Sequence, residues 1–131
     1  MNTKRWFLIT ISILIVDDDT DILFLYQKMI EHIGFEVVGI AHNGEKAVEL
    51  YKSLQRKPDI ILMDHRMPKK NGVEATKEIL SICNYTRIIF TSADKSVEKE
   101  ALSIGAVSFL EKPFSLERLR MSILNATNLI Q

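Results

Sequence analysis

The sequence is poor in the residues that build several common kinds of site. Its 131 residues include one cysteine, Cys83, together with three prolines and five glycines. A single cysteine excludes an internal disulfide and a zinc site built from cysteines. The sequence also lacks an excess of charge of one sign, because 17 basic residues balance 17 acidic residues and the formal net charge is zero. This balance gives no electrostatic footprint for direct binding of nucleic acid or an anionic membrane.

Long hydrophobic runs are scarce, and the longest lies near the N-terminus. Lys4 and Arg5 precede an apolar run over residues 6–16, an order similar to that of a signal peptide. The run is too short to span a bilayer, and it continues into Asp17 without a small-residue cleavage site. We therefore interpret residues 1–12 as an apolar leader and expect a cytoplasmic protein. The leader could extend a strand, pack on a sheet edge or mediate self-association.

Short apolar runs alternate with segments of helical periodicity along the rest of the chain. The runs predict strands over residues 13–16, 36–41, 60–64, 87–91 and 107–110. Helices are predicted over residues 20–33, after Asn43, and over residues 72–83, 96–104 and after Ser115 as far as Ile130. The first helix would turn inward Ile22, Leu25, Tyr26, Met29, Ile30 and Ile33, and end at Gly34. This alternation with short connections predicts a doubly wound α/β domain around a parallel sheet.

Polar side chains follow four of the five predicted strands. In chain order these are Asp17 and Asp18, then Asp64, then Thr91 with Ser92, and finally Lys112. Each alone has an ordinary interpretation as a helix cap, a turn residue or a surface lysine, and that interpretation is the more common one. Parallel strands, however, end at the same edge of a sheet, where ligands bind in open α/β folds. Together these residues therefore predict one site.

The residue types at this edge suit phosphoryl transfer. Crowded carboxylates repel one another, and a proton or a cation must relieve the repulsion. Hard oxygen ligands in small number suit Mg²⁺. A carboxylate is itself a nucleophile toward phosphorus and, being ionised, needs no general base. An ammonium group and a hydroxyl donor then stabilise the charge that develops.

In its motifs the chain resembles the receiver domain of two-component response regulators, and in particular the single-domain chemotaxis regulators. The matching segments are residues 13–19, residues 62–68 with Asn71 and Gly72, residues 90–93 and residues 105–114. No single segment is specific, but the combination is, and it covers residues 13 to 130. The resemblance implies a flavodoxin-like (βα)5 sandwich over residues 13–131, with a five-stranded parallel sheet in the order 2-1-3-4-5.

The resemblance also implies a role for each residue of the site. Asp64 would accept a phosphoryl group from a sensor histidine kinase, assisted by Lys112 and Thr91. Mg²⁺ would be held by Asp64, Asp18, Asp17 through water, and the backbone carbonyl of Arg66. A cis peptide between Lys112 and Pro113 would orient the lysine, and Thr91 with Phe109 would form the conformational switch.

The implied protein is a signalling switch rather than an enzyme, although it would catalyse phosphoryl transfer to and from its own Asp64. It would signal by docking an unidentified protein target on the face made by its fourth helix, fifth strand and last helix, as a stand-alone domain. It would be a monomer or a weak homodimer and would bind no nucleic acid or membrane directly. The sequence leaves the kinase, the target and the lifetime of the phosphorylated state open. Arg66 and Ala93 flank the expected path of the hydrolytic water and bear on that lifetime.

Two alternatives compete with this interpretation. A phosphatase of the haloacid dehalogenase type also uses a strand-end aspartate with Mg²⁺, but its Asp-x-Asp-x-Thr/Val pattern at the first strand would require Thr or Val at Asp21. It would also leave Asp64 unexplained. A degenerate receiver that only docks is disfavoured by the complete set of polar groups. His65 is interpreted as non-catalytic because strand alternation turns it away from Asp64.

Overall fold

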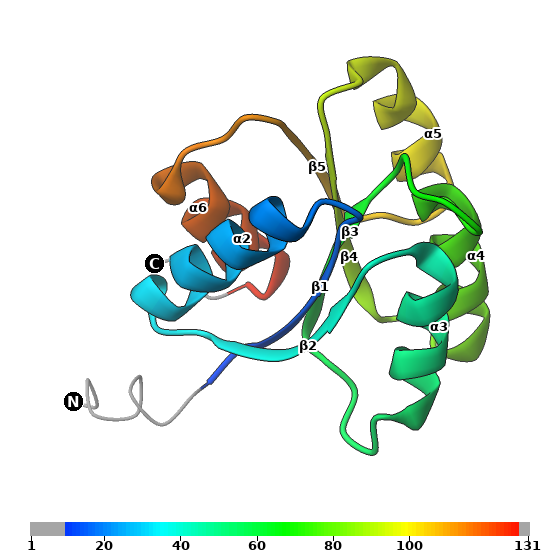
Figure 1. The fold of residues 1–131 in the computed structure, drawn as a ribbon, viewed down its shortest axis with the longest axis horizontal. Helices are drawn as coiled ribbons and strands as arrows, with labels where there is room; N and C mark the ends of the chain where they lie inside the picture. Colours follow the sequence, from blue (N-terminus) through cyan, green and yellow to red (C-terminus); the bar gives the residue numbers. More distant parts are fainter. Residues whose placement is uncertain (1–9, 129–131) are drawn as a thin grey trace.

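The computed structural model describes residues 10–128 and contains a five-stranded parallel sheet between two layers of helices (Figure 1). The strands are β1 (Ser12–Val16), β2 (Glu36–Ala41), β3 (Ile60–Asp64), β4 (Arg87–Ser92) and β5 (Ser108–Glu111). Their order in the sheet is β2-β1-β3-β4-β5, and every pair of neighbours is parallel. The predicted fold class and strand order are therefore confirmed. Residues 1–9, which hold most of the predicted leader, and residues 129–131 lie outside the described residues.

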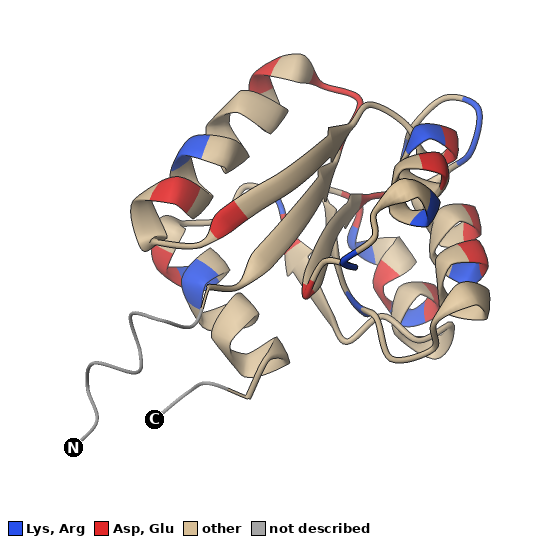
Figure 2. Ribbon diagram, turned by 90° about the horizontal axis from the view of Figure 1, so that it is seen from below, with Lys and Arg blue, Asp and Glu red and all other residues tan. Residues whose placement is uncertain are grey.

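Helices cover both faces of the sheet. They are α2 (Thr20–Ile33), α3 (Gly44–Ser53), α4 (Gly72–Ile82), α5 (Glu98–Ser103) and α6 (Leu116–Ala126). Figure 1 shows α2 and α6 on one face and α3, α4 and α5 on the other. Lys, Arg, Asp and Glu are interspersed along these helices, while the strands are largely free of them (Figure 2). Among the described residues, no helix combines the length and the apolar character needed to cross a membrane.

The central strands are buried on both sides because alternate side chains enter two separate cores. Ile13 and Leu62 face the α2 and α6 layer, whereas Leu14 and Met63 face the layer of α3, α4 and α5. All four are 0% exposed. Each such side chain contributes about 1.5–3 kcal/mol when it is buried. This is why β1 and β3 read in the sequence as continuous apolar runs rather than as alternating ones.

The helix ends follow the expected capping residues. The Asn43 side chain accepts a hydrogen bond from the backbone N–H of Lys46 at the start of α3. The Ser115 side chain accepts one from the backbone N–H of Arg118 at the start of α6. Gly34 ends α2 with a φ of 107°, in the left-handed region that glycine adopts without strain. Asp19 caps α2 by accepting from two backbone N–H groups. Of the three consecutive aspartates at residues 17–19, Asp19 is therefore a structural cap.

Two local predictions need correction. The helix expected over residues 96–104 is divided, because Asp94 caps a short 3-10 turn (Lys95–Val97) and α5 begins only at Glu98. In α2, Leu25 is 50% exposed, whereas Leu23 is 3% exposed and belongs to the core. The run of apolar residues over 22–26 offers several possible inward faces, and packing on the sheet selects the one that contains Leu23.

Candidate functional site

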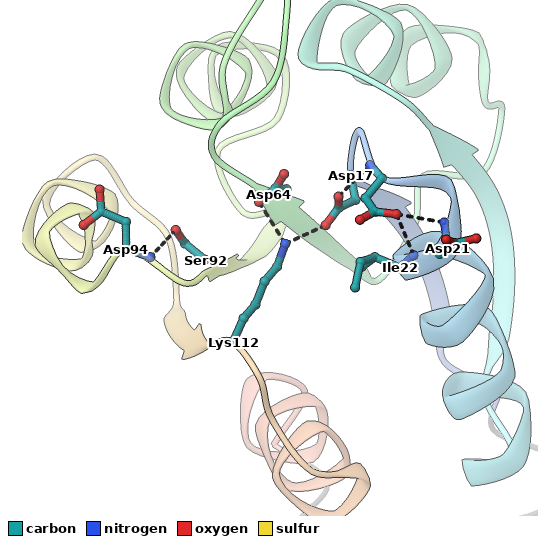
Figure 3. A network of polar contacts seen from close by, with 8 residues as sticks. Asp17, Asp21, Ile22, Asp64, Ser92, Asp94 and Lys112 are labelled. Carbon is teal, nitrogen blue, oxygen red and sulfur yellow. Dashed lines mark hydrogen bonds and ion pairs between the residues drawn. The ribbon is translucent and has the colours of Figure 1, made fainter.

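The polar residues predicted at the strand ends come together at one edge of the sheet (Figure 3). Asp17 directly follows β1, Asp64 is the last residue of β3, and Lys112 directly follows β5. Thr91 lies in β4 in register with Asp64. The parallel topology thus brings together residues separated by as many as 95 positions in the chain.

Lys112 lies between two carboxylates. Its ammonium group donates to Asp17 Oδ2 at 2.7 Å and to Asp64 Oδ1 at 3.1 Å. Its backbone N–H donates to the carbonyl of Ser92 at 2.9 Å, and its peptide bond to Pro113 is cis. Burial alone would lower the pKa of Lys112, but the two carboxylates raise the pKa above its ordinary value. The lysine therefore remains charged.

Asp64 is a buried carboxylate, with 6% of its surface exposed. Burial is the main cause that raises its pKa to about 6, the negative charge of Asp17 adds to the rise, and Lys112 opposes it. The same negative charge that makes Asp64 reactive is thus destabilising in the folded protein at neutral pH. A cation next to Asp64 would relieve this cost.

Three acidic side chains form a group suited to such a cation. One carboxylate oxygen from each of Asp17, Asp18 and Asp64 lies within 4.8 Å of the others. Asp17 is 1% exposed, and its Oδ1 is fixed by the backbone N–H of Asp19 at 2.9 Å. An all-oxygen set of this size fits Mg²⁺, which prefers a few carboxylates and keeps several waters. Asp18 is exposed and leaves one side of the group open to solvent.

The loop after β3 approaches Asp64 closely. A Cβ atom on Gly72 would lie 2.2 Å from the carbonyl oxygen of Asp64, so only glycine fits at this position. The N–H of Gly72 also donates to the carbonyl of His65 at 2.9 Å. The ring of His65 lies against Phe90, with the ring centroids 6.2 Å apart. Gly72 therefore helps to set the position of the backbone that carries Asp64.

An ion pair crosses the entrance to the site. Arg66, whose backbone carbonyl is the predicted metal ligand, extends its side chain to Asp94 at 2.6 Å. The two residues line a crevice of about 330 Å³ together with Asp64, Ser92, Ala93 and Lys112. Sequence reasoning missed this contact. The loops after β3 and β4 could be expected to face each other, because the two strands are neighbours in the sheet. The pairing of Arg66 with Asp94 depends in addition on side-chain conformations.

The two predicted switch residues differ in their surroundings. Thr91 is 0% exposed, and its hydroxyl oxygen has no hydrogen-bond partner among the described residues. Phe109 is half-buried and packs against the core beneath α3, α4 and α5. The unpartnered hydroxyl of Thr91 is unusual, since most buried polar atoms are hydrogen-bonded.

Comparison with known proteins gives a consistent result. Residues 13–124 match the family model of the response regulator receiver domain. The chemotaxis protein CheY of Thermotoga maritima is 43% identical over 109 residues, which are 82% of this chain and 89% of that protein. The CheY of Bacillus subtilis is 40% identical over 118 residues, which are 88% of this chain and 97% of that protein.

Solved structures agree with the sequence relatives. One is a crystal structure of a CheX-CheY-BeF3-Mg+2 complex from Borrelia burgdorferi, with a TM-score of 0.86, 28% identity and coverage of 89% of each chain. Another is the response regulator domain of Thermotoga maritima CheB, with a TM-score of 0.84 and 34% identity. That comparison covers 94% of this chain and 100% of the other.

Proposed function

The chain belongs to the family of response regulator receiver domains, and from this premise we propose that it is a phosphorylation switch with Asp64 as its phosphoacceptor. The observation that carries the proposal is the setting of Asp64, a buried strand-end carboxylate held at 3.1 Å by a charged lysine. Phosphoryl-accepting signalling is the general function of the family.

In the transfer step, an oxygen of Asp64 attacks phosphorus, and the bond between phosphorus and the donor breaks. The electron pair of that bond leaves with the donor, which is the imidazole of a sensor histidine kinase or the acetate of acetyl phosphate. No general base takes part, because the attacking carboxylate is ionised above its pKa of about 6. Lys112 is already placed to neutralise charge on the phosphoryl oxygens, and Thr91 offers a hydroxyl donor.

Asp18 and Asp64 would hold Mg²⁺ directly and Asp17 would hold it through water, with the backbone carbonyl of Arg66 as a further protein ligand. The bound metal would supply positive charge next to the phosphoryl oxygens and to Asp64. Support for this proposal comes from the chemistry of the three oxygen donors and from their mutual distances. Among the residues of the chain, Lys112 fixes the orientation of Asp64, and Asp17 in turn holds the ammonium group of Lys112.

Phosphorylation would change the surface through Thr91 and Phe109. A rotation of Thr91 toward the new phosphoryl group would leave space for Phe109 to turn inward. This would alter the face formed by α5, β5 and α6, on which a downstream protein would dock. A two-state change of this kind requires only that the phosphoryl group interact differently with the two conformations.

Acetyl phosphate provides a direct test. The purified protein is incubated with Mg²⁺ and acetyl phosphate, and its intact mass is recorded beside Asp64→Asn and the control Asp59→Asn. Asp59 lies before β3, at the opposite end from Asp64, and accepts a hydrogen bond from Ser12. We expect one phosphoryl adduct on the wild type and on Asp59→Asn, and none on Asp64→Asn or without metal. An adduct that persists in Asp64→Asn would overturn the assignment.

A further inference from the structure

The loop between β3 and α4 contacts the first turn of α3. Gly44 is the first residue of α3, and its backbone N–H donates to the carbonyl of Lys70 in the loop at 3.0 Å. The first N–H groups of a helix have no partner within the helix, and here the loop supplies one. Helices α3 and α4 lie side by side on the same face of the sheet (Figure 1). The contact therefore fixes Lys70 relative to a helix that carries none of the predicted site residues.

Gly44 leaves no space between the helix and the loop. The residue is buried, and a Cβ atom on it would lie 2.2 Å from the carbonyl oxygen of Lys70 and 2.8 Å from its carbonyl carbon. Both are backbone atoms, which cannot rotate away as the end of a flexible side chain can. A side chain at position 44 would therefore push the loop away from α3.

Lys70 is held a second time, through its side chain. Its ammonium group pairs with one carboxylate oxygen of Glu78 on α4, and Lys52 of α3 lies 3.7 Å from the other oxygen. Glu78 thus links the loop to both helices. These side chains are partly exposed, so solvent makes this anchor weaker than a buried pair would be.

The loop is stiff between Lys70 and the end of β3. Lys69 has a φ of 69°, and on either side of it the backbone N–H of Lys70 donates to the carbonyl of Pro68 at 2.8 Å. The proline ring fixes a further backbone angle. Beyond Lys70, the N–H of Gly72 is tied to the carbonyl of His65. A displacement of Lys70 would therefore be passed on toward the end of β3 rather than absorbed within the loop.

We propose that Gly44 is a positioning residue for the metal, which with Glu78 holds Lys70 so that the backbone carbonyl of Arg66 stays in place for Mg²⁺. The inference rests on the proposed function, because it requires the Arg66 carbonyl as a metal ligand. Residues that orient the ligands of a metal commonly change its affinity by about 10–100-fold when they are replaced. Gly44 acts through the loop and touches neither the metal nor the phosphoryl group.

Magnesium binding to the full chain tests the proposal without a phosphoryl donor. Mg²⁺ is titrated into the wild type, Gly44→Ala and the control Gly39→Ala, and binding is followed by NMR. Gly39 lies in β2, where an added Cβ would crowd a side-chain methyl group of Leu50 at 2.8 Å rather than the loop. Both variants should melt at a lower temperature than the wild type. Only Gly44→Ala should need at least about tenfold more Mg²⁺ for half-saturation.

Phosphoryl uptake separates positioning from general damage to the site. With acetyl phosphate, Gly44→Ala should be slow at low Mg²⁺ and approach the rate of the wild type when Mg²⁺ is saturating. Equal Mg²⁺ affinity for Gly44→Ala and the wild type would overturn the role of Gly44, as would an equal loss of affinity in Gly39→Ala. In either case the proposed function would stand. A wild type that binds no Mg²⁺ would overturn the metal site of the proposed function and this inference with it.

A second pair of variants tests the loop anchor even if Gly44→Ala does not fold. Glu78→Gln and Glu49→Gln each remove one negative charge from a partly or fully exposed side chain, and Glu49 pairs with Lys46 within α3. We expect Mg²⁺ binding to be about twofold weaker in Glu78→Gln, which loses the weaker anchor. Glu49→Gln should bind Mg²⁺ as the wild type does. Equal affinities in these two variants would overturn the anchoring of the loop through Lys70.

Discussion

Replacement of Asp64 by asparagine should stabilise the metal-free protein at neutral pH. Burial and the charge of Asp17 raise the pKa of Asp64 from 3.8 to about 6 in the folded protein. Each pKa unit corresponds to about 1.4 kcal/mol, so the ionised carboxylate costs about 3 kcal/mol of stability. Asparagine has nearly the same shape and carries no charge. We therefore expect Asp64→Asn to unfold with a free energy higher by as much as about 3 kcal/mol.

The gain should depend on pH in a defined direction. Well below the ordinary pKa of 3.8 the carboxyl group is protonated in both the folded and the unfolded chain, and the two proteins should be equally stable. As the pH rises from about 4 to 6, the unfolded chain loses its proton first. The wild type then loses stability relative to the variant, and the difference becomes constant above about pH 7.

Urea unfolding followed by circular dichroism measures this difference. Both proteins are compared with EDTA at about pH 4, 6 and 8, together with Asp59→Asn, which removes a carboxylate from the other end of the β3 segment. Since Asp59 accepts a hydrogen bond from the backbone of Ser12 at 2.9 Å, replacing its carboxylate by the weaker, uncharged amide acceptor should lower stability rather than raise it. A difference between Asp64→Asn and the wild type that does not change with pH would refute the reasoning. So would a wild type that is the more stable protein at about pH 8.

Two further predictions concern the loops around the site. Gly72→Ala should lower the free energy of unfolding by about 2 kcal/mol and slow phosphoryl uptake, because the added Cβ would lie 2.2 Å from the carbonyl oxygen of Asp64. Urea unfolding measures the first effect, and intact mass measures the second. Unchanged uptake would contradict the positioning role of Gly72. Arg66→Ala should change stability by less than about 1 kcal/mol, since the Arg66 side chain is 77% exposed. It should nevertheless shorten the lifetime of the phosphorylated protein by opening the crevice to water, and an unchanged decay of the phosphoryl adduct would argue against a role for the ion pair with Asp94.

The elements of the fold could be predicted because their signals are local. The apolar runs over residues 36–41 and 60–64 coincide with β2 and β3, and the caps at Asn43 and Ser115 need only a side-chain oxygen close to the first turn. The predictions were less accurate where local signals are ambiguous. The sequence after Asp94 is compatible with both a 3-10 turn and an α-helix, and the structure contains the 3-10 turn followed by the α-helix.

The candidate site could be predicted as a group but not in its internal contacts. Topology alone places the strand ends on one edge, so that Asp17, Asp64 and Lys112 were expected together. Contacts such as that between Arg66 and Asp94 join residues that are far apart in the chain. They depend on rotamers and on the rotation of each helix, which the spacing of apolar residues leaves undetermined.

The charges of the site explain why its parts should move together. Three carboxylates, Asp17, Asp18 and Asp64, lie close together, and one ammonium group, Lys112, pairs with two of them, so the site carries two negative charges in excess. A divalent cation balances this excess, but a phosphoryl group would add negative charge on the side of Asp64. Lys112 would then interact more strongly with the phosphoryl oxygens and less with Asp17. Since Lys112 is also bonded through its backbone to Ser92, next to Thr91, we expect a shift of the lysine to be coupled to the loop that follows β4.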